Sequence, residues 1–149
     1  MALVSKHLSM QTSIGAVEAF FEAFRRHDIK GMLTHCNPNG QVSIAPMGDD
    51  GKGQIKTVGQ KFWSELTEAF PNLSNEITTV FADLDGHVCA EVVVAGTQQE
   101  DFGTIKNQGL HFQLDQSFVF DVGFDGLIQK IDCYWDNATF YQQLRKRHL

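Results

Sequence analysis

Four stretches in the second half of the chain alternate apolar and polar residues, as half-buried β-strands do. They span residues 74–82, 88–97, 109–120 and 127–136. Asp85-Gly86 and residues 123–126 are turn signals between neighbouring stretches, and a polar loop covers residues 98–108. This half of the chain therefore predicts a run of sequential antiparallel strands.

The first half of the chain shows helical spacing instead. Ser13 fits an N-cap, and a helix is predicted behind it from the apolar residues Ile14, Val17, Phe20, Phe21 and Phe24. Further predictions are a short helix over 29–36, a stop at 37–40, a short strand over 41–47, a flexible loop over 48–53 and a helix over 57–70. Helices and one short strand followed by sequential strands predict an α+β fold on an antiparallel sheet.

The length and composition fit one globular domain. The chain has 149 residues, of which 42% are hydrophobic and 20% are charged. Its 12 Phe against 2 Tyr and 2 Trp predict an interior rich in aromatic rings, which fits a plain core or an apolar cavity. We expect residues 1–13 to form a flexible N-terminal tail and residues 14–149 to form the single domain.

The net charge, the hydropathy and the cysteines disfavour several kinds of partner and site. A net charge of −6 disfavours nucleic acid, which needs clustered Lys and Arg. No stretch approaches the roughly 18 apolar residues of a membrane span, and residues 1–13 lack the apolar run of a signal peptide. The 3 cysteines have no CxxC spacing and predict neither a disulfide framework nor a zinc site. We therefore expect a cytoplasmic protein with no metal or cofactor and no nucleic-acid or membrane partner.

Four segments together resemble a known family. They are Val17 to Phe24, Phe62 to Leu73, Asp125-Gly126-Leu127-Ile128, and Tyr134-Trp135-Asp136 followed by Gln143-Leu144. In this order and spacing they resemble the SnoaL-like polyketide cyclases of the ketosteroid-isomerase and nuclear-transport-factor-2-like superfamily. The resemblance implies a cystatin-like, cone-shaped α+β barrel, in which a strongly curved, mainly antiparallel sheet wraps around three N-terminal helices. It also implies an internal pocket for a small apolar molecule and homodimers formed through the outer face of the sheet.

The resemblance further implies an aspartate base on the last strand and a histidine partner on the preceding strand. An aligned count places Cys133 at the base position and Gln116 near the partner position. Asp132 is adjacent, and it faces the other side of the strand unless a bulge turns it inward. A general base works best where apolar surroundings raise its pKa, whereas Asp132 lies between Lys130 and Tyr134 as an exposed carboxylate would. Asp132 and Cys133 are the catalytic candidates, and Cys133 fits a nucleophile or an inert buried thiol.

Several residues are candidates to line the pocket. Gln116 is the polar member of an otherwise apolar strand face, where its amide needs either a protein partner or a ligand. The other candidates are Phe118 on the same face, Phe20, Trp63, Trp135, and His35 at the pocket mouth. Each aromatic residue also fits a plain core position. Asp136 fits an N-cap of a terminal helix over 137–145.

Three functions follow from these expectations, and the sequence leaves them open. The chain can be a cofactor-independent cyclase or isomerase that abstracts a proton from an apolar ring substrate. It can bind such a molecule without converting it. It can also be a dimeric interaction module whose cavity is filled by its own Phe side chains. An open cavity that holds Gln116, Cys133 and an ionisable group would favour the first two functions.

Overall fold

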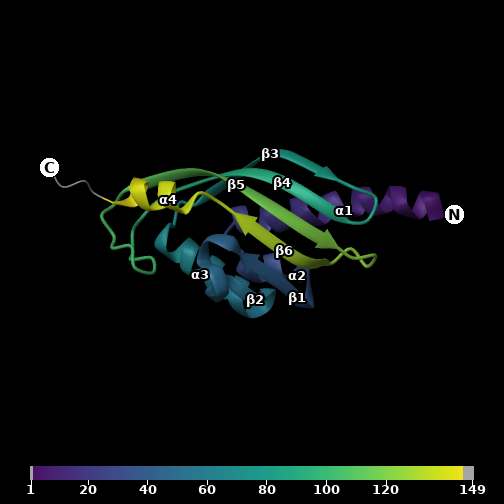
Figure 1. Ribbon diagram of the computed structural model, residues 1–149, viewed down its shortest axis with the longest axis horizontal. Helices are drawn as coiled ribbons and strands as arrows, with labels where there is room; N and C mark the ends of the chain where they lie inside the picture. Colours follow the sequence, from purple (N-terminus) through teal and green to yellow (C-terminus); the bar gives the residue numbers. More distant parts are fainter. Residues whose placement is uncertain (1, 146–149) are drawn as a thin grey trace.

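A six-stranded sheet organises the molecule (Figure 1). The computed structural model describes residues 2–145, with side chains from Met10 onward. The sheet has the strand order β2-β1-β6-β5-β4-β3. All neighbouring strands are antiparallel except β1 and β6, which are parallel. The strands are β1 (Cys36–Ile44), β2 (Lys52–Gln54), β3 (Ser74–Ala82), β4 (His87–Thr97), β5 (His111–Val122) and β6 (Ile128–Tyr134).

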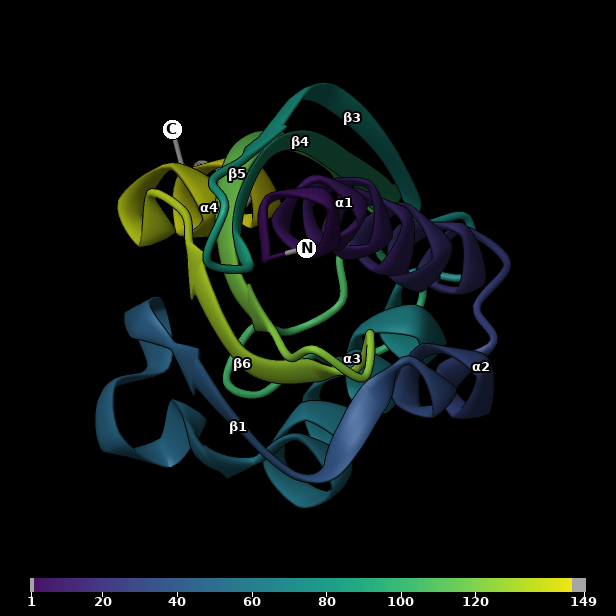
Figure 2. The ribbon, with the colours of Figure 1, turned by 90° about the vertical axis from the view of Figure 1, so that its right-hand side faces the viewer.

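The helices lie mainly toward the N-terminus of the chain. They are α1 (Ala2–Arg25), α2 (Ile29–Thr34), α3 (Gln60–Ala69) and α4 (Asn137–Leu144), with the 3-10 segment η1 (Ala45–Gly51) and the π-helical turn η2 (Ile55–Gly59) between β1 and α3. Figure 2 shows the sheet as a curved, unclosed arc with α1 on its concave side. The predicted α+β architecture, a strongly curved and mainly antiparallel sheet around N-terminal helices, is confirmed.

Aromatic rings fill the space between α1 and the sheet. Phe20 and Phe21 of α1 meet Phe118 and Phe120 of β5 edge to face, with centroids 5.0 Å apart for Phe21 and Phe118 and 5.6 Å apart for Phe20 and Phe120. Burying each such side chain stabilises the fold by roughly 1.5–3 kcal/mol. The many Phe residues of the sequence therefore form a plain core in this part of the molecule.

Two hairpin turns lie where the sequence predicts them, and each contains a glycine with positive φ. Gly86 has φ 87° and Gly126 has φ 80°, a region that other residues adopt at a steric cost. A Cβ atom on Gly86 would also lie 2.2 Å from the carbonyl oxygen of Val122. The tight turns fix the register of the strands beside them.

Three local predictions are wrong. Helix α1 begins at Ala2 instead of Ser13, because residues 2–12 contain no Gly or Pro to stop it, and Ser13 is buried within the helix. The predicted stop at residues 37–40 lies inside β1, where the register shifts between Cys36 and Gln41 and accommodates Pro38. Residues 48–53, predicted as a flexible loop, belong to η1 and β2.

Two predictions about the whole chain are not tested by the fold. The mobility of residues 1–13 stays a prediction, and so does the cytoplasmic location. Over the described part of the chain, no helix combines the length and apolar character that a membrane crossing requires.

Candidate functional site

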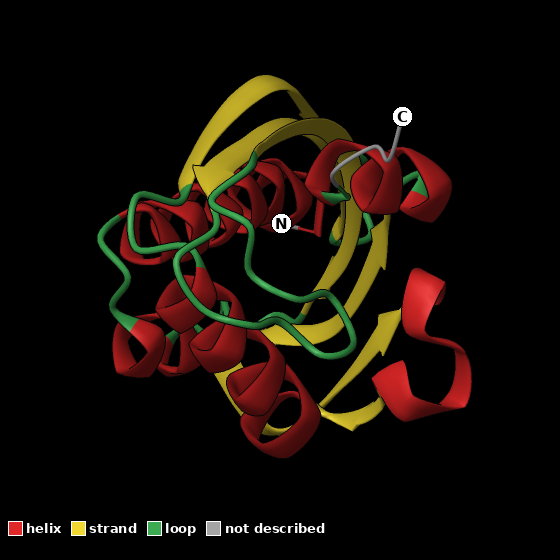
Figure 3. Ribbon diagram, turned by 90° about the vertical axis from the view of Figure 1, so that its left-hand side faces the viewer, coloured by secondary structure: helices red, strands yellow, loops and turns green. Residues whose placement is uncertain are grey.

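A cavity of about 360 Å³ lies near the end of β6 that leads into α4. Aromatic side chains form much of its wall: Phe62, Phe102, Trp135, Phe140 and Tyr141. They come from α3, the loop between β4 and β5, the residue after β6, and α4. Figure 3 views the molecule from this end, where the loop between β4 and β5 passes near α4. The volume suits a small organic molecule, since ligand pockets measure about 300–1,000 Å³.

The aromatic wall is held by ring packing within it. Phe62 stacks on Trp135 with centroids 5.9 Å apart and planes inclined by 20°. Phe102 meets Phe62 at 6.1 Å and Phe140 at 6.2 Å, both edge to face. The indole Nε1 of Trp135 donates a hydrogen bond to Oδ1 of Asn137 at 3.2 Å. These contacts hold flat ring surfaces in fixed orientations at the cavity wall.

Helix α4 is fastened at both ends. Asp136 caps it, because its carboxylate accepts hydrogen bonds from the backbone N–H groups of Ala138 and Thr139 at 3.1 Å and 3.3 Å, as predicted from the sequence. Near the other end, the amide of Gln143 bonds the backbone of Gln113 in β5 twice: its Oε1 accepts from N–H at 2.7 Å and its Nε2 donates to C=O at 3.1 Å. These bonds position the helix that carries Phe140 and Tyr141.

The loop between β4 and β5 is organised by the buried side chain of Gln98, which is 0% exposed. Its Nε2 donates to the carbonyl oxygens of Glu100 and Ile105, each at 3.0 Å. Phe102 and Ile105 also form an isolated antiparallel bridge. The loop thereby has a defined shape and contributes Phe102, Gly103, Thr104 and Ile105 to the cavity wall.

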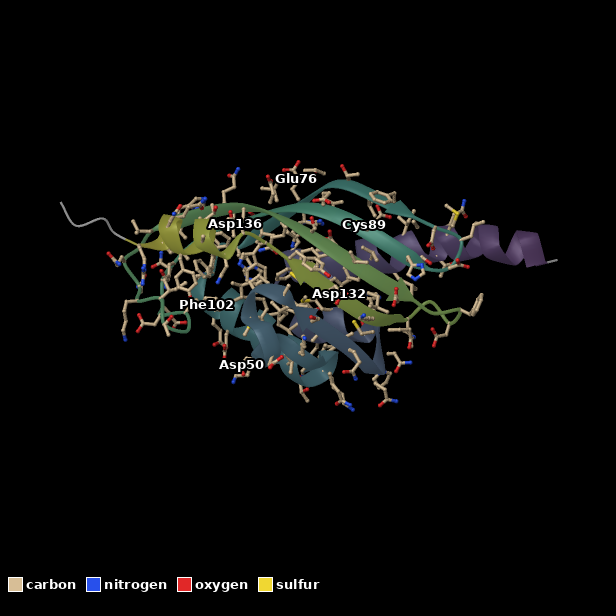
Figure 4. All side chains as sticks on the ribbon, in the orientation of Figure 1. Asp50, Glu76, Cys89, Phe102, Asp132 and Asp136 are labelled. Carbon is tan, nitrogen blue, oxygen red and sulfur yellow. The ribbon has the colours of Figure 1, made fainter. Side chains whose placement is uncertain are left out.

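Two carboxylates line the cavity, Asp50 of η1 and Glu65 of α3, and both residues are exposed. The hydroxyl groups of Thr104 and Tyr141 also lie at the wall, with their oxygens 3.5 Å apart. An adjoining hollow of about 390 Å³ shares Met47, Asp50, Phe62 and Glu65 with the cavity and adds Val58 and Lys61. Asp50 and Phe102 are labelled in Figure 4. The site thus combines ring surfaces with groups that can accept or donate a proton.

Cys133 and Gln116 lie together in the interior, as the strand pattern predicts. The Sγ of Cys133 is 3.9 Å from Oε1 of Gln116, and both residues are buried. Burial raises the pKa of the Cys133 thiol far above its ordinary value, and the charge of Asp132 raises it further. The thiol is therefore neutral at physiological pH and is a poor nucleophile. Neither residue lines the cavity described above.

Asp132 lies on the opposite face of β6, partly exposed, with its Oδ2 3.6 Å from Nζ of Lys130 (Figure 4). The pairing of β6 with β5 runs without a shift from Lys130 to Tyr134, so no bulge turns Asp132 inward. The position agrees with the alternation of the strand. The role of Asp132 as a base stays a prediction that the geometry of the cavity does not support.

The other predicted pocket residues divide between the cavity and the core. Trp135 lines the cavity. Phe20, Phe118 and Trp63 are at most 1% exposed and belong to the packed core, where the rings of Phe20 and Trp63 are 5.4 Å apart. The placement of His35 at the pocket mouth needs correction. It follows α2, and its carbonyl oxygen accepts from the N–H of Ile128, at the start of β6 and away from the cavity.

Apart from Trp135, the residues of the cavity wall were not singled out as pocket residues from the sequence, among them Asp50, Glu65, Phe102, Phe140 and Tyr141. Only Phe102 carried a local signal, as a large apolar residue within a polar loop. The others come from segments that fold together only in three dimensions. Among the described residues, no group of three His, Cys, Asp or Glu side chains could hold a metal ion.

Comparison with known proteins places this architecture in a family. The family model of the SnoaL-like domain matches residues 17–131. This chain belongs to the SnoaL-like family. Among curated proteins, none matches this SnoaL-like chain.

Solved structures share the fold of the SnoaL-like chain. A candidate polyketide cyclase from Xanthomonas campestris pv. campestris superposes with a TM-score of 0.79 at 24% identity, covering 92% of this chain and 99% of that chain. A candidate SnoaL-like polyketide cyclase from Jannaschia sp. CCS1 gives 0.79 at 15% identity, covering 93% and 95%. An LEH-like epoxide hydrolase from M. tuberculosis gives 0.70 at 18% identity, covering 91% and 90%. Identities this low establish the fold alone.

Proposed function

We propose that this SnoaL-like protein binds a small molecule with an apolar ring in the aromatic cavity and converts it by cofactor-independent proton transfer, as a cyclase or isomerase. The observation that carries the proposal is one cavity of about 360 Å³ that combines five aromatic side chains with two carboxylates. Ring surfaces bind an apolar body, and a few polar groups orient it. The family assignment supports a pocket protein of the cyclase or isomerase type.

The polar groups of the cavity suit proton transfer beside a carbonyl group. Glu65 is on the helix α3 and Asp50 is on η1, and either carboxylate can accept a proton from a carbon next to a carbonyl. The hydroxyl groups of Thr104 and Tyr141 can donate hydrogen bonds to the oxygen on which negative charge develops. We assign the base to Asp50 or Glu65 instead of Asp132, which pairs with Lys130 on the outer face.

Binding without conversion is the second candidate function. It is favoured by the neutral pair at the two positions where the family resemblance implied a base and its partner. Cys133 is a buried thiol and Gln116 an amide, so neither can accept a proton as a carboxylate does. The third hypothesis, a module with a filled cavity, receives no support from the cavity at the end of β6.

Deuterium incorporation into 2-tetralone, an apolar bicyclic ketone, tests the proposal. We expect the protein in D₂O to bind the ketone and to accelerate exchange of the protons next to its carbonyl, followed by NMR. Asp50→Asn and Glu65→Gln together should reduce the accelerated rate by about 100-fold, the lower range for a general base. Asp132→Asn is the matched control and should leave the rate unchanged.

Each alternative has its own outcome in this experiment. Binding of 2-tetralone without faster exchange would support the binding protein and contradict catalysis. If the exchange rate drops in Asp132→Asn and persists in the double variant, the base is Asp132 on β6 and not a carboxylate of the cavity. Thr104→Trp places a bulky ring at the cavity wall and should abolish binding, so full binding by this variant would show that the ligand site lies elsewhere.

A further inference from the structure

We infer that the ligand of the aromatic cavity is an organic cation, in which an ammonium group is attached to an apolar ring. This inference rests on the proposed function for the same cavity and adds the charge of its ligand. It follows from which charged groups line the cavity, from what those groups contact, and from the kind of surface beside them.

The charged residues that line the cavity, Asp50 and Glu65, are both acidic. Among the residues that the structure describes, no Lys, Arg or His lines this cavity. Within residues 10–145, neither carboxylate takes part in an ion pair or a side-chain hydrogen bond. The neighbouring acidic residue Asp49, in contrast, lies 3.9 Å from Nζ of Lys52. Two carboxylates without protein partners therefore face a site that a ligand can enter.

A lysine of this region, Lys61, lies outside the wall of the aromatic cavity. Lys61 lines the adjoining hollow but not the aromatic cavity, while Asp50, Glu65 and Phe62 line both. An ammonium group at this shared wall would meet the two carboxylates, and its ring would extend toward Trp135. A carboxylate ligand in the same pose would meet two like charges, which is unfavourable at short range.

Aromatic rings strengthen the preference for a cation. The face of an aromatic ring attracts a cation within about 6 Å of its centroid. One such contact exists within the molecule, where the guanidinium carbon of Arg145 lies 5.8 Å from the centroid of Tyr141. The stacked pair of Phe62 and Trp135 offers further ring surface beside Glu65 and Asp50. The net charge of −6 also favours the approach of cations over anions.

The two carboxylates also allow recognition and conversion in one complex. One of them can pair with the ammonium group, and the other can remain available to accept a proton from the ring. Asp50 and Glu65 come from different segments, η1 and α3. Each carboxylate is therefore positioned by its own part of the backbone.

Three probes of similar size and different charge test the inference at neutral pH: phenethylamine, 2-phenylethanol and 3-phenylpropanoate. Each is titrated against the protein while the indole N–H signal of Trp135 is followed by NMR. We expect the amine to bind about tenfold more tightly than the alcohol, and the alcohol to bind more tightly than the carboxylate. Phenyltrimethylammonium extends the series and should also bind more tightly than the alcohol.

Variants assign the preference to the carboxylates. Asp50→Asn and Glu65→Gln should each weaken binding of phenethylamine about fivefold and leave binding of 2-phenylethanol unchanged. The matched controls are Asp49→Asn and Glu68→Gln, which remove the same charge from exposed neighbours that do not line the cavity, and these should leave both affinities unchanged.

The possible failures are distinguishable. Equal affinity for the amine and the alcohol, or equal effects of the cavity variants and their controls, would overturn the inference while leaving the pocket function in place. Absence of binding by phenethylamine would overturn the inference alone if 2-tetralone still binds. Absence of binding by 2-tetralone and all of the probes would overturn the inference and the proposed function together.

Discussion

At the scale of single residues, the interior of β5 and β6 holds a neutral thiol and an amide where the family resemblance implied an ionisable pair. An ionised carboxylate at the buried position of Cys133 would need a strong partner, and Gln116 supplies only a neutral one. The ionisable groups of the candidate site lie instead at the cavity wall, at Asp50 and Glu65, where water can solvate them. The ionisable side chains therefore line the cavity, whereas the neutral pair lies in the core away from it.

Asp136 gives a prediction for pH. The hydrogen bonds from the Thr139 hydroxyl and from the backbone N–H groups of Thr139 and Ala138 lower the pKa of its carboxyl group. Its stabilising contribution is therefore fully present above the ordinary aspartate pKa of about 3.9 and is lost as the pH falls through the lower folded value. Asp136→Ala should lower Tm by about 2–4 °C at neutral pH, measured by circular dichroism.

The difference in Tm between Asp136→Ala and the wild type should shrink as the pH falls below about 4. Asp136→Asn is the control, since Asn keeps an oxygen acceptor for the cap and has no carboxyl proton to gain. The Tm of Asp136→Asn should lie close to that of the wild type at neutral pH. A difference for the Ala variant that grows on acidification would contradict the role of the ionised cap.

At the scale of elements, α4 depends on its side-chain bonds to β5, and Gln143→Ala tests this dependence. The variant removes both hydrogen bonds to Gln113 and should lower the free energy of unfolding by about 1 kcal/mol, measured by urea denaturation. Hydrogen exchange should show faster exchange of the Gln113 amide, because that N–H donates to the Gln143 side chain. Gln142→Ala removes an exposed neighbour and should leave this amide protected. Unchanged protection of the Gln113 amide in Gln143→Ala would contradict the role of these hydrogen bonds in holding α4 against β5.

The strands and the cavity differ in how well the sequence predicts them. The limits of β3 were predicted to the residue, and those of β4 to β6 to within two residues, because alternation and turn glycines are local signals. A pocket was predicted, but most of its wall residues were not, because they come from η1, α3, a loop and α4, which no periodic pattern links. Of the predicted pocket residues, Trp135 lies at the wall of this cavity. Phe20, Phe118 and Trp63 fill the core because facing rings pack against each other there.

At the scale of the whole molecule, the outer face of the sheet is partly apolar. Val93, Ala95 and Val119 are half-buried on this face, while Phe81 is 58% exposed and Tyr134 is 47% exposed. Such an arrangement suits contact with a second copy of the chain, and the homodimer predicted from the sequence stays a prediction.

Light scattering at micromolar concentration tests the dimer. We expect a mass of twice 16.7 kDa for the wild type. Val93→Glu should reduce it to that of the monomer, because Val93 is half-buried on the outer face and a carboxylate there would lose its water against the partner. Thr57→Glu adds the same charge at an exposed position of η2 and should remain dimeric. A wild-type mass of 16.7 kDa would contradict the prediction.

The parallel pairing of β1 with β6 has a consequence for synthesis of the protein. Residues 36–44 cannot pair with residues 128–133 until residue 133 has left the ribosome, which is about 90 residues after β1. Until then the three-residue β2 is the only strand that β1 can pair with among the described residues, and its other edge stays unpaired. The nascent chain must therefore keep an unpaired strand edge soluble until β6 emerges, and the cavity wall is completed only when α4 follows.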